Sequence, residues 1–475
     1  MSRMILAAAA ALALPAALAA QATRPASVQN NISVDAPVIA ITGVKLIDGT
    51  GKPARDNQTV VIQNGKIAAV GATGQVQVPS GARTIDGAGH TLIPGMVGMH
   101  DHLFYTAGGG RAAQANYTAP RLYLASGVTT IRTTGASSAY ADLFVKKAVD
   151  EGKMPGPRIH ATAPYLTGAG NQSPTQAMVT TPEAARRFVR YWHDEGATWI
   201  KAYTDISREN LKAAIDEAHK LGMKVTGHLC SVSFQEAVAL GIDNLEHGML
   251  TASDFYANKP ADICPTDSYG VVATKGDATS PAAQATIQAM VSKNIPMTST
   301  LPVFEAFVPG RPVTDQRTLD AMAPEVRERY LQDRKQIDAA GEDYIFSEGA
   351  LKRAMEFERA FVKAGGLLAA GVDPTGNGGA LPGFGDQRGY ELLREAGFNA
   401  EETVQIVSFN GAKVLGVDKE LGSIEVGKQA DVVLLRGDLV ADPSVIRNGV
   451  TVFKGGLGFD PAKLIASVKG RVGIN

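Results

Sequence analysis

Residues 92–103 read Leu-Ile-Pro-Gly-Met-Val-Gly-Met-His-Asp-His-Leu, an apolar run that ends in two histidines. The run predicts a buried strand, and side chains two positions apart on a strand point the same way. His100 and His102 therefore aim two imidazoles at one point. Because neutral imidazole is the commonest metal ligand, this stretch indicates a divalent metal site at a strand end.

Strand and helix patterns alternate from about Thr91 onward. Amphipathic stretches at 182–195 and 208–221 separate short apolar runs, a rhythm typical of parallel βαβ units. The predicted strands are Thr91–Met99, Val128–Thr133, Arg158–Thr162, Trp199–Tyr203, Lys224–His228, Asn244–His247, Ile295–Ser299 and Gly366–Val372. Eight such units close into an α/β (β/α)8 TIM-like barrel, whose chemistry lies at the carboxyl ends of the strands.

Both ends of the chain carry β patterns. Short alternating strands run from Val38 to Asp86, with a hairpin turn at Asn64-Gly65, and β patterns return after Gly422. We expect the two ends to form one small β-sandwich. The predicted organisation is a signal peptide at 1–22, a linker at 23–37, a composite β-sandwich from 38–92 and 415–475, and a barrel at 93–414. The long connections 250–292 and 302–359 are expected to be lids or substrate walls.

The first 22 residues have the pattern of a secretory signal. Arg3 supplies the positive start, an apolar core follows from Ile5 to Leu14, and Ala20-Gln21-Ala22 offers a small-x-small cleavage site. An uncleaved N-terminal anchor is the alternative. No later stretch is long enough to span a membrane. We expect an exported protein, periplasmic or secreted.

The overall charge limits the classes of molecule that this protein is expected to bind, and the cysteine content limits its disulfide bonding. The chain has 46 Lys plus Arg against 47 Asp plus Glu, and no basic cluster. This balance argues against nucleic acid or an anionic membrane and favours a small-molecule partner. Cys230 and Cys264 allow a disulfide or two buried thiols, and the sequence leaves both open. It leaves the oligomeric state open as well.

Residues of metal-ligand type recur at the ends of the predicted strands. They are His100, His102, Lys201, His228, His247 and Asp373. Taken singly, each has a structural explanation, such as a satisfied histidine, a helix-capping Asp373 or a salt-bridged Lys201. Taken together, they would all point at the mouth of one barrel. That joint pattern predicts a metal centre.

Lys201 decides which kind of centre is expected. An ammonium beside two divalent cations would be strongly repelled, so the lysine must be absent from the centre or chemically changed. A neutral lysine can capture carbon dioxide as a carbamate, an anionic ligand able to bridge two metals roughly 3.5–4 Å apart. We therefore predict two divalent ions bridged by carboxylated Lys201. Zinc is expected, although the ligand types also accept Mn, Co or Fe.

The motifs resemble the amidohydrolase superfamily, in its binuclear imidazolonepropionase-like and Xaa-Pro-dipeptidase-like branch. The resemblance covers nearly all of the chain after the signal. It rests on Gly43-Val-Lys-Leu-Ile-Asp-Gly-Thr-Gly, the 92–103 stretch, Leu245-Glu-His-Gly and Leu421-Gly-Ser-Ile-Glu-Val-Gly-Lys-Gln-Ala-Asp-Val-Val. It implies that His100, His102, Lys201 and Asp373 hold one metal and that Lys201, His228 and His247 hold the second. Single-metal imidazolonepropionases and cyclic deaminases need no bridging lysine, so Lys201 argues against that activity here.

The resemblance also implies a mechanism. A metal-bridging hydroxide would attack a carbonyl, and Asp373, as general acid/base, would pass the proton to the leaving nitrogen. The predicted function is an exported metal-dependent hydrolase of carbon–nitrogen bonds, acting on a dipeptide or an N-acyl amino acid. The alternatives are a lactonase or esterase, or a cyclic-amide hydrolase, with the same centre. A non-catalytic metal- or ligand-binding barrel would lack a ligand, and this chain keeps the whole set.

The candidates for substrate contact are single residues, each with packing as the alternative. Tyr203 is the last residue of predicted strand four and can donate to an oxyanion. Arg111 follows the glycines at 108–110 and can pair with a carboxylate. The other three candidates are Tyr165, His160 and Arg388.

Overall fold

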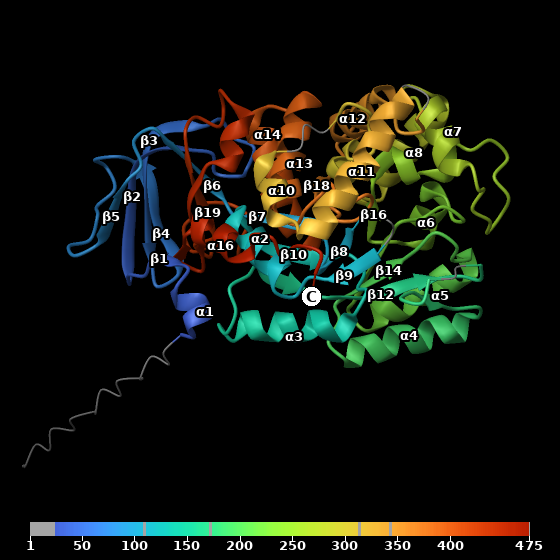
Figure 1. Ribbon diagram of the computed structural model, residues 1–475, viewed down its shortest axis with the longest axis horizontal. Coiled ribbons are helices and arrows are strands. Elements are labelled where there is room, and N and C mark those ends of the chain that lie inside the picture. The colour runs from blue at the N-terminus through green and yellow to red at the C-terminus, as the bar shows by residue number, and fades with distance from the viewer. Residues whose placement is uncertain (1–23, 108–110, 171–172, 312–314, 342–343, 475) are drawn as a thin grey trace, which may run out of the picture.

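The computed structural model describes residues 24–107, 111–170, 173–311, 315–341 and 344–474, and of Arg111 it describes the backbone only. The predicted signal peptide at 1–22 lies outside this part. The fold is mixed α/β (Figure 1), with strands from both chain ends at one end of the molecule and parallel strands surrounded by helices in the rest.

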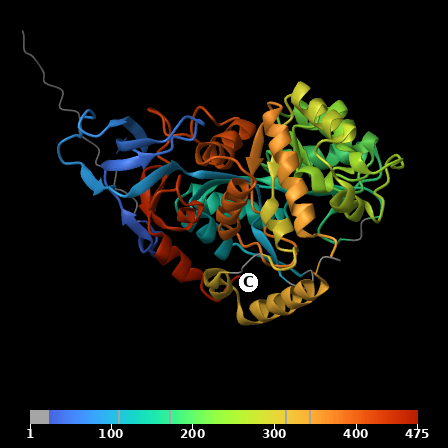
Figure 2. The same cartoon turned by 90° about the horizontal axis from the view of Figure 1, so that it is seen from above.

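The strands of the two chain ends share one nine-stranded sheet. Antiparallel pairing of β6 with β19 and of β1 with β21 joins the two ends, and Figure 2 shows the blue N-terminal strands beside the red C-terminal segment. The strands, along the sheet, are β1 (Ile32–Val34), β21 (Leu457–Phe459), β20 (Gly449–Lys454), β19 (Val432–Arg436), β6 (His90–Pro94), β2 (Val38–Leu46), β3 (Arg55–Gln63) and β4 (Lys66–Ala72), with β5 (Arg83–Asp86) on β2. Ile39, Val60 and Phe453 belong to one buried apolar cluster, so strands from both chain ends share one core. The pairing of the chain ends agrees with the sequence, whereas the two-layer sandwich stays a prediction.

The remaining main strands are parallel and form two sheets. The smaller has the order β11 (Arg158–His160), β10 (Val128–Thr133), β7 (Met96–Asp101). The larger has the order β13 (Ala177–Met178), β12 (Thr162–Thr167), β14 (Trp199–Ala202), β15 (Lys224–Gly227), β16 (Asn244–Glu246), β17 (Met297–Ser299), β18 (Leu368–Ala370). A hairpin of β8 (Phe104–Ala107) and β9 (Arg111–Gln114) follows β7.

The two parallel sheets approach each other on both sides. On one side the predicted strand Arg158–Thr162 is divided between β11 and β12, and the N–H of Ala136 bonds the carbonyl of Ala163 across the break at 3.3 Å. On the other, the N–H of Asp373 donates to the carbonyl of His100 at 2.8 Å. Within the described strands no ladder joins β18 to β7, so the sheet pairing does not confirm a closed eight-stranded barrel.

Gly95 divides the first predicted strand into two. β6 belongs to the terminal sheet and β7 to a parallel sheet, so the single strand predicted over Thr91–Met99 is wrong. A Cβ on Gly95 would lie 2.2 Å from Oγ1 of Thr129, which only glycine avoids. The chain therefore crosses from one sheet to the other at a point where the backbone packs directly on β10.

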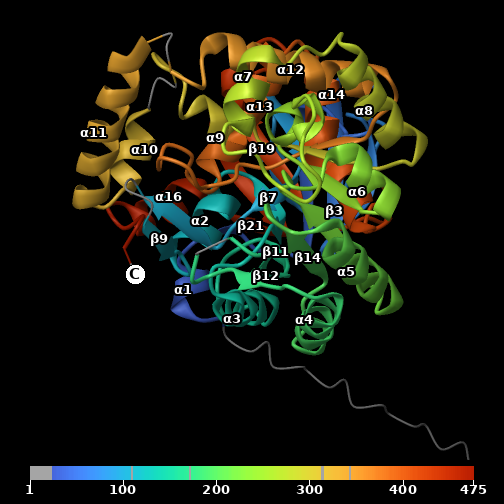
Figure 3. The ribbon, with the colours of Figure 1, turned by 90° about the vertical axis from the view of Figure 1, so that its right-hand side faces the viewer.

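Helices α3 to α5 lie along one side of the parallel strands, and α7, α8 and α12 lie along the opposite side (Figures 1 and 3). The longer helices are α2 (Thr118–Ala125), α3 (Ala139–Asp150), α4 (Pro182–Asp194), α5 (Arg208–Lys220), α6 (Phe234–Leu240), α7 (Ser268–Lys275), α8 (Pro281–Ser292), α11 (Pro324–Ala340), α12 (Glu348–Lys363), α13 (Phe384–Glu395) and α16 (Pro461–Val468). The shorter ones are α1 (Ala26–Gln29), η1 (Gly248–Thr251), η2 (Ser253–Phe255), α9 (Leu301–Glu305), α10 (Gln316–Ala321), α14 (Ala400–Gln405), η4 (Ile406–Asn410), α15 (Gly411–Leu415) and η5 (Pro443–Arg447). Among the helices described, none combines the length and the apolar character needed to cross a bilayer.

Candidate metal centre

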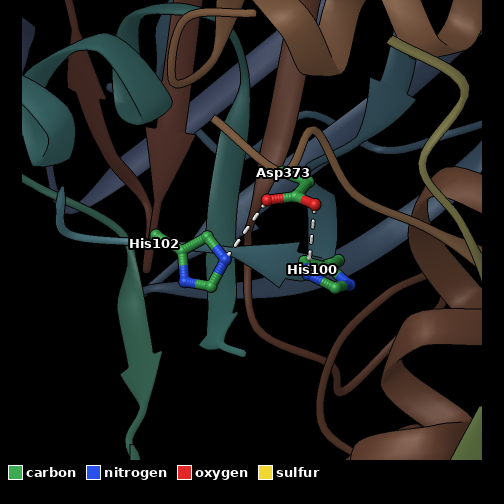
Figure 4. A group of neighbouring side chains, drawn as sticks. All are labelled: His100, His102 and Asp373. Atoms are coloured by element: carbon green, nitrogen blue, oxygen red, sulfur yellow. Dashed lines mark ion pairs between the residues drawn. The ribbon is translucent and has the colours of Figure 1, made fainter. Parts of the chain in front are cut away.

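Asp373 lies between His100 and His102, with one carboxylate oxygen facing each ring (Figure 4). Its Oδ2 is 3.6 Å from Nε2 of His100, and its Oδ1 is 3.4 Å from Nε2 of His102. All three side chains are buried, and their ligand atoms lie within 4.8 Å of one another. Two imidazoles at the end of β7 and a carboxylate after β18 thus form a pocket of the size that one metal ion needs.

His247 and His228 extend this cluster. The ring centroid of His247 is 4.4 Å from that of His100 and 4.4 Å from that of His228. His228 follows β15 and His247 follows β16, so each comes from the carboxyl end of its own parallel strand. The structure therefore brings together all four histidines that the sequence placed at strand ends.

His247 and Asp373 both have left-handed backbone conformations. Their φ angles are 69° and 49°. Non-glycine residues seldom adopt this region, and holding one there costs on the order of 1–3 kcal/mol. Such conformations persist where the surrounding structure imposes them, which is common at functional sites.

Lys201 is buried against the same centre. Its side chain on β14 is 0% exposed, and it lines a cavity together with His100, His228 and Asp373. Burial lowers its pKa to about 8 because water is removed from the ammonium. Within the described part of the chain, Nζ has no hydrogen-bond partner. Burying an amine without a hydrogen-bond partner costs free energy. The unpartnered Nζ therefore indicates that a further group completes this site.

Hydrogen bonds at Nδ1 fix the orientation of three rings. Nδ1 of His100 lies 2.7 Å from Oε2 of Glu246, and Nδ1 of His102 lies 2.9 Å from the carbonyl oxygen of Gly135. Nδ1 of His247 lies 2.7 Å from Oγ1 of Thr300. Since Nδ1–H donates outward to the carboxylate and the carbonyl, the neutral tautomer of each of these two rings keeps its lone pair on Nε2, which faces Asp373.

Glu246 is the centre of a buried polar network behind His100. Arg132 and Thr226 both donate to its Oε1, and Nδ2 of Asn244 donates to the same oxygen at 2.8 Å. The Arg132 guanidinium also lies over the Trp199 ring, 4.5 Å from its centroid. A fully hydrogen-bonded buried carboxylate stays ionised, so the network holds an anion against the outer nitrogen of His100.

The donor set fits divalent metal ions. Burial, followed by the positive charge of Lys201, lowers the pKa of His228 to about 3 and that of His100 well below its ordinary value. The rings of His100 and His228 are therefore neutral near pH 7, which leaves them lone pairs for coordination. Nε2 of His247 has no hydrogen-bond partner among the described residues, as is the case for Nζ of Lys201. These two unpartnered atoms lie at the same centre, where they are available to a bound ion or to a group that holds it.

The cavity in front of the centre has a volume of about 280 Å³. Tyr165 and Tyr203 lie on its wall, with ring centroids 5.1 Å apart, and the Tyr165 hydroxyl is 3.4 Å from Nε2 of His102. Thr106 and Thr375 add hydroxyls to the lining. The wall thus combines aromatic faces with neutral hydrogen-bonding groups.

Three substrate candidates from the sequence are not placed at this cavity. Arg388 is bonded to Glu305 at 2.6 and 2.9 Å and to Glu391 at 2.7 Å, and it lines a different cavity. The structure thus pairs its guanidinium with carboxylates away from the metal-centre cavity, and its role as a substrate contact stays a prediction. His160 is not among the residues that line the metal-centre cavity. The side chain of Arg111 lies outside what the structure describes.

Two residues beside the metal centre were given no role from the sequence. Glu246 stands in the Leu245-Glu-His-Gly motif, but nothing in the spacing indicated that its side chain reaches His100. Tyr269 lies 2.7 Å from Nε2 of His228, although it is 41 residues away in a connection without a local motif. Only the three-dimensional structure reveals such contacts.

Comparison with known proteins agrees with this geometry. A model of the amidohydrolase family matches residues 91–457. A 5'-deoxyadenosine deaminase of Methanobrevibacter smithii is 33% identical over 72 residues, which are 14% of this chain and only 17% of that protein. The structure of a bottromycin amidohydrolase superposes with a TM-score of 0.71 at 18% identity, over 93% of this chain and 92% of that chain. A Xaa-Pro dipeptidase with bound methionine superposes with a TM-score of 0.65 at 21% identity, over 89% of this chain and 100% of that chain. At these identities the two structures show a common fold.

Proposed function

The chain belongs to the amidohydrolase family, and from this premise we propose that it is a metal-dependent hydrolase that cleaves the C–N amide bond of a dipeptide or an N-acyl amino acid. The observation that carries the proposal is the convergence of four histidines, Asp373 and an unpartnered buried lysine on one centre beside a cavity. The proposal extends to the scaffold, in which the two parallel sheets would act as one barrel with this cavity at its mouth.

Two ions would be held by the six residues at the strand ends. His100, His102 and Asp373 would hold one, His228 and His247 the other, and Lys201, carboxylated on Nζ, would bridge them. The burial and lack of partners of Nζ support this modification, because a carbamate would supply the missing contacts. When bound, divalent ions such as Zn²⁺ supply Lewis acidity, which activates water and polarises a carbonyl.

The chain's own residues would move the proton and hold the substrate. Asp373 would accept a proton from the attacking water and deliver it to the leaving nitrogen, so that C–N cleavage yields an acid and an amine. Tyr165 and Tyr203 stay protonated at neutral pH, since burial raises their pKa values and takes that of Tyr203 to about 12. Their hydroxyl groups can therefore donate to a substrate oxygen.

Export is part of the proposal. The residue pattern of 1–22 supports it, and so does the Cys230–Cys264 disulfide, because disulfides persist in oxidising compartments. Cell fractionation with N-terminal sequencing of the mature protein tests this part. We expect a periplasmic or secreted chain cut after Ala22, and a cytoplasmic chain with an intact N-terminus would overturn it.

A lactone, ester or cyclic amide is the second candidate substrate. In the described lining of the cavity, Lys201 is the only basic side chain apart from the histidines, so an uncharged substrate also suits the wall. The test is a hydrolysis screen of Zn²⁺-loaded protein against dipeptides, N-acyl amino acids and lactones. Preferred turnover of acyl-amino acids or dipeptides supports the amidase proposal, and preferred turnover of lactones overturns it in favour of the second candidate. Absence of any turnover, with fewer than two ions bound, would contradict both.

A further inference from the structure

Tyr269 contacts one of the proposed metal ligands from outside the strand framework. Its hydroxyl lies 2.7 Å from Nε2 of His228. Tyr269 stands in the first turn of α7, in the long connection between β16 and α8 that the sequence predicts to be a lid or a substrate wall. The orientation of the His228 ring thus depends on a segment that is not part of the parallel sheet.

The contact reverses the arrangement seen at the other rings. His100, His102 and His247 each engage Nδ1 in a hydrogen bond, and His100 and His102 face Asp373 with Nε2. His228 engages Nε2, which leaves Nδ1 as its nitrogen for a metal ion. If Nε2–H donates to the Tyr269 oxygen, the lone pair stays on Nδ1, the tautomer that coordination through Nδ1 needs.

A disulfide ties the two sides of this contact together. Cys230 lies two residues after His228, Cys264 lies five residues before Tyr269, and the two cysteines are bonded. The two cysteines are 34 positions apart in the sequence. The sequence alone allowed either this disulfide or two buried thiols. The covalent link therefore limits how far the segment bearing Tyr269 can move from the turn bearing His228.

Other contacts hold the earlier part of the same connection. Asp254 accepts hydrogen bonds from the backbone N–H groups of Phe234 and Gln235 at 2.8 and 3.0 Å. Lys259 donates to the carbonyl oxygen of Ser231 at 2.5 Å. These polar contacts and the disulfide hold the connection close to the segment that follows β15, while Arg353 of α12 donates to the carbonyl oxygen of Ala273 in α7.

We propose that Tyr269, held in place by the Cys230–Cys264 disulfide, is a positioning residue that sets the His228 imidazole for coordination through Nδ1. Metal retention at His228 then depends on the redox state of the disulfide. A dithiol reductant would supply two electrons and two protons, giving two thiols on the protein and a disulfide on the reductant. The inference rests on the proposed function, since it takes His228 as a metal ligand.

Zinc binding to matched tyrosine variants tests the tyrosine. The experiment measures the number of Zn²⁺ ions and their affinities by competition with a chelator, in the full protein and without substrate. Tyr269→Phe is expected to keep both ions but to bind one of them about 10–100-fold more weakly, the usual effect of losing such an outer contact. Tyr256→Phe is the control, because Tyr256 lies in the same connection and its hydroxyl contacts Asp267 instead. Equal affinities in Tyr269→Phe and the wild type would overturn the role of Tyr269.

The disulfide is tested by the double variant Cys230→Ala/Cys264→Ala and by reduction of the wild type with a dithiol. Both are expected to weaken the binding of the same Zn²⁺ ion. Adding Tyr269→Phe to the double variant should lower that affinity only slightly further, because the changes act through one contact. If the reduced protein or the cysteine variant binds Zn²⁺ with wild-type affinity, then the disulfide does not hold Tyr269 in place. His228→Ala separates the two hypotheses. If this variant also binds two ions with wild-type affinity, then the proposed metal centre fails. If it loses one ion while the Tyr269 and cysteine variants do not, then only the present inference fails.

Discussion

Two clusters of buried charged and polar groups in this protein differ in how far their bonding is satisfied. In the metal centre, Nζ of Lys201 and Nε2 of His247 have no hydrogen-bond partner among the described residues. In a second cluster around Glu305, which is 1% exposed, Arg388 and Arg311 both bind that carboxylate, at 2.6 and 3.0 Å. Arg388 and Arg447 also share Glu391, which completes what we term the Glu305 cluster.

The difference separates a site that needs a ligand from one that is complete. Each charge of the Glu305 cluster has its counter-charge within the chain, so its net contribution is structural. The metal centre instead gathers imidazole rings, a carboxylate and an unpartnered amine, a set that bound cations would complete. The two unpartnered nitrogens, gathered with the other possible ligands at one point, therefore distinguish the metal centre from the Glu305 cluster.

The largest expected effect comes from removing Lys201. Lys201→Ala should abolish hydrolysis and lower the metal content below two ions per chain, because the bridging ligand is lost. Metal analysis and turnover measure both effects. Lys224→Ala is the control, since Lys224 lies on the adjacent β15 and donates to the carbonyl of Val414. Near-normal turnover in Lys201→Ala would show that the unpartnered amine does not mark the functional centre.

Asp373→Asn addresses the proton transfer that distinguishes the metal centre from a passive charge cluster. The amide keeps the shape of the side chain but cannot accept the proton. We expect kcat to fall about 10²–10⁴-fold, the usual contribution of a general acid/base. Steady-state kinetics with metal content measured in parallel separates loss of catalysis from loss of an ion. Unchanged kcat with both ions bound would remove Asp373 from the mechanism.

Glu246→Gln tests a residue that shares a feature with each cluster. Its carboxylate is paired with an arginine, as in the Glu305 cluster, and it is also hydrogen-bonded to a proposed metal ligand. The change leaves Arg132 buried without its counter-charge, which should cost about 3–5 kcal/mol of stability. It should also weaken metal binding about 10–100-fold through His100. Adding Arg132→Met should restore part of the stability but not the metal affinity. Parallel recovery of both would show that Glu246 acts on folding alone.

The alternating strand and helix pattern of the sequence predicted most of the parallel strands, because apolar runs bounded by amphipathic helices report burial directly. It could not show that β6 and β7 are separate strands, since the division at Gly95 depends on a tertiary contact with Thr129. It likewise could not show that Arg158–Thr162 is shared between two sheets. Local patterns indicate that a strand exists, whereas its partners are fixed by packing.

For the metal centre, the spacing of the histidines gave the convergence of the rings, because parallel strands end at one edge. The outer contacts of those rings were not predictable, since Glu246, Thr300 and Tyr269 reach them from elements distant in sequence. The pairing of Arg388 with Glu305 was not predictable for the same reason. An arginine free to bind a substrate and an arginine paired with Glu305 look alike in a sequence.

Arg388→Met is expected to have the smallest effect, and it tests the satisfied side of the comparison. The substitution removes two hydrogen bonds to Glu305, but Arg311 still pairs with that carboxylate, so the buried charge is not left alone. We therefore expect a loss of about 1–3 kcal/mol in the free energy of unfolding, the range for hydrogen bonds to charged groups. Turnover and metal content should equal those of the wild type, because Arg388 does not line the metal-centre cavity. A raised KM with unchanged stability would instead place Arg388 on the substrate and reverse the assignment of the two clusters.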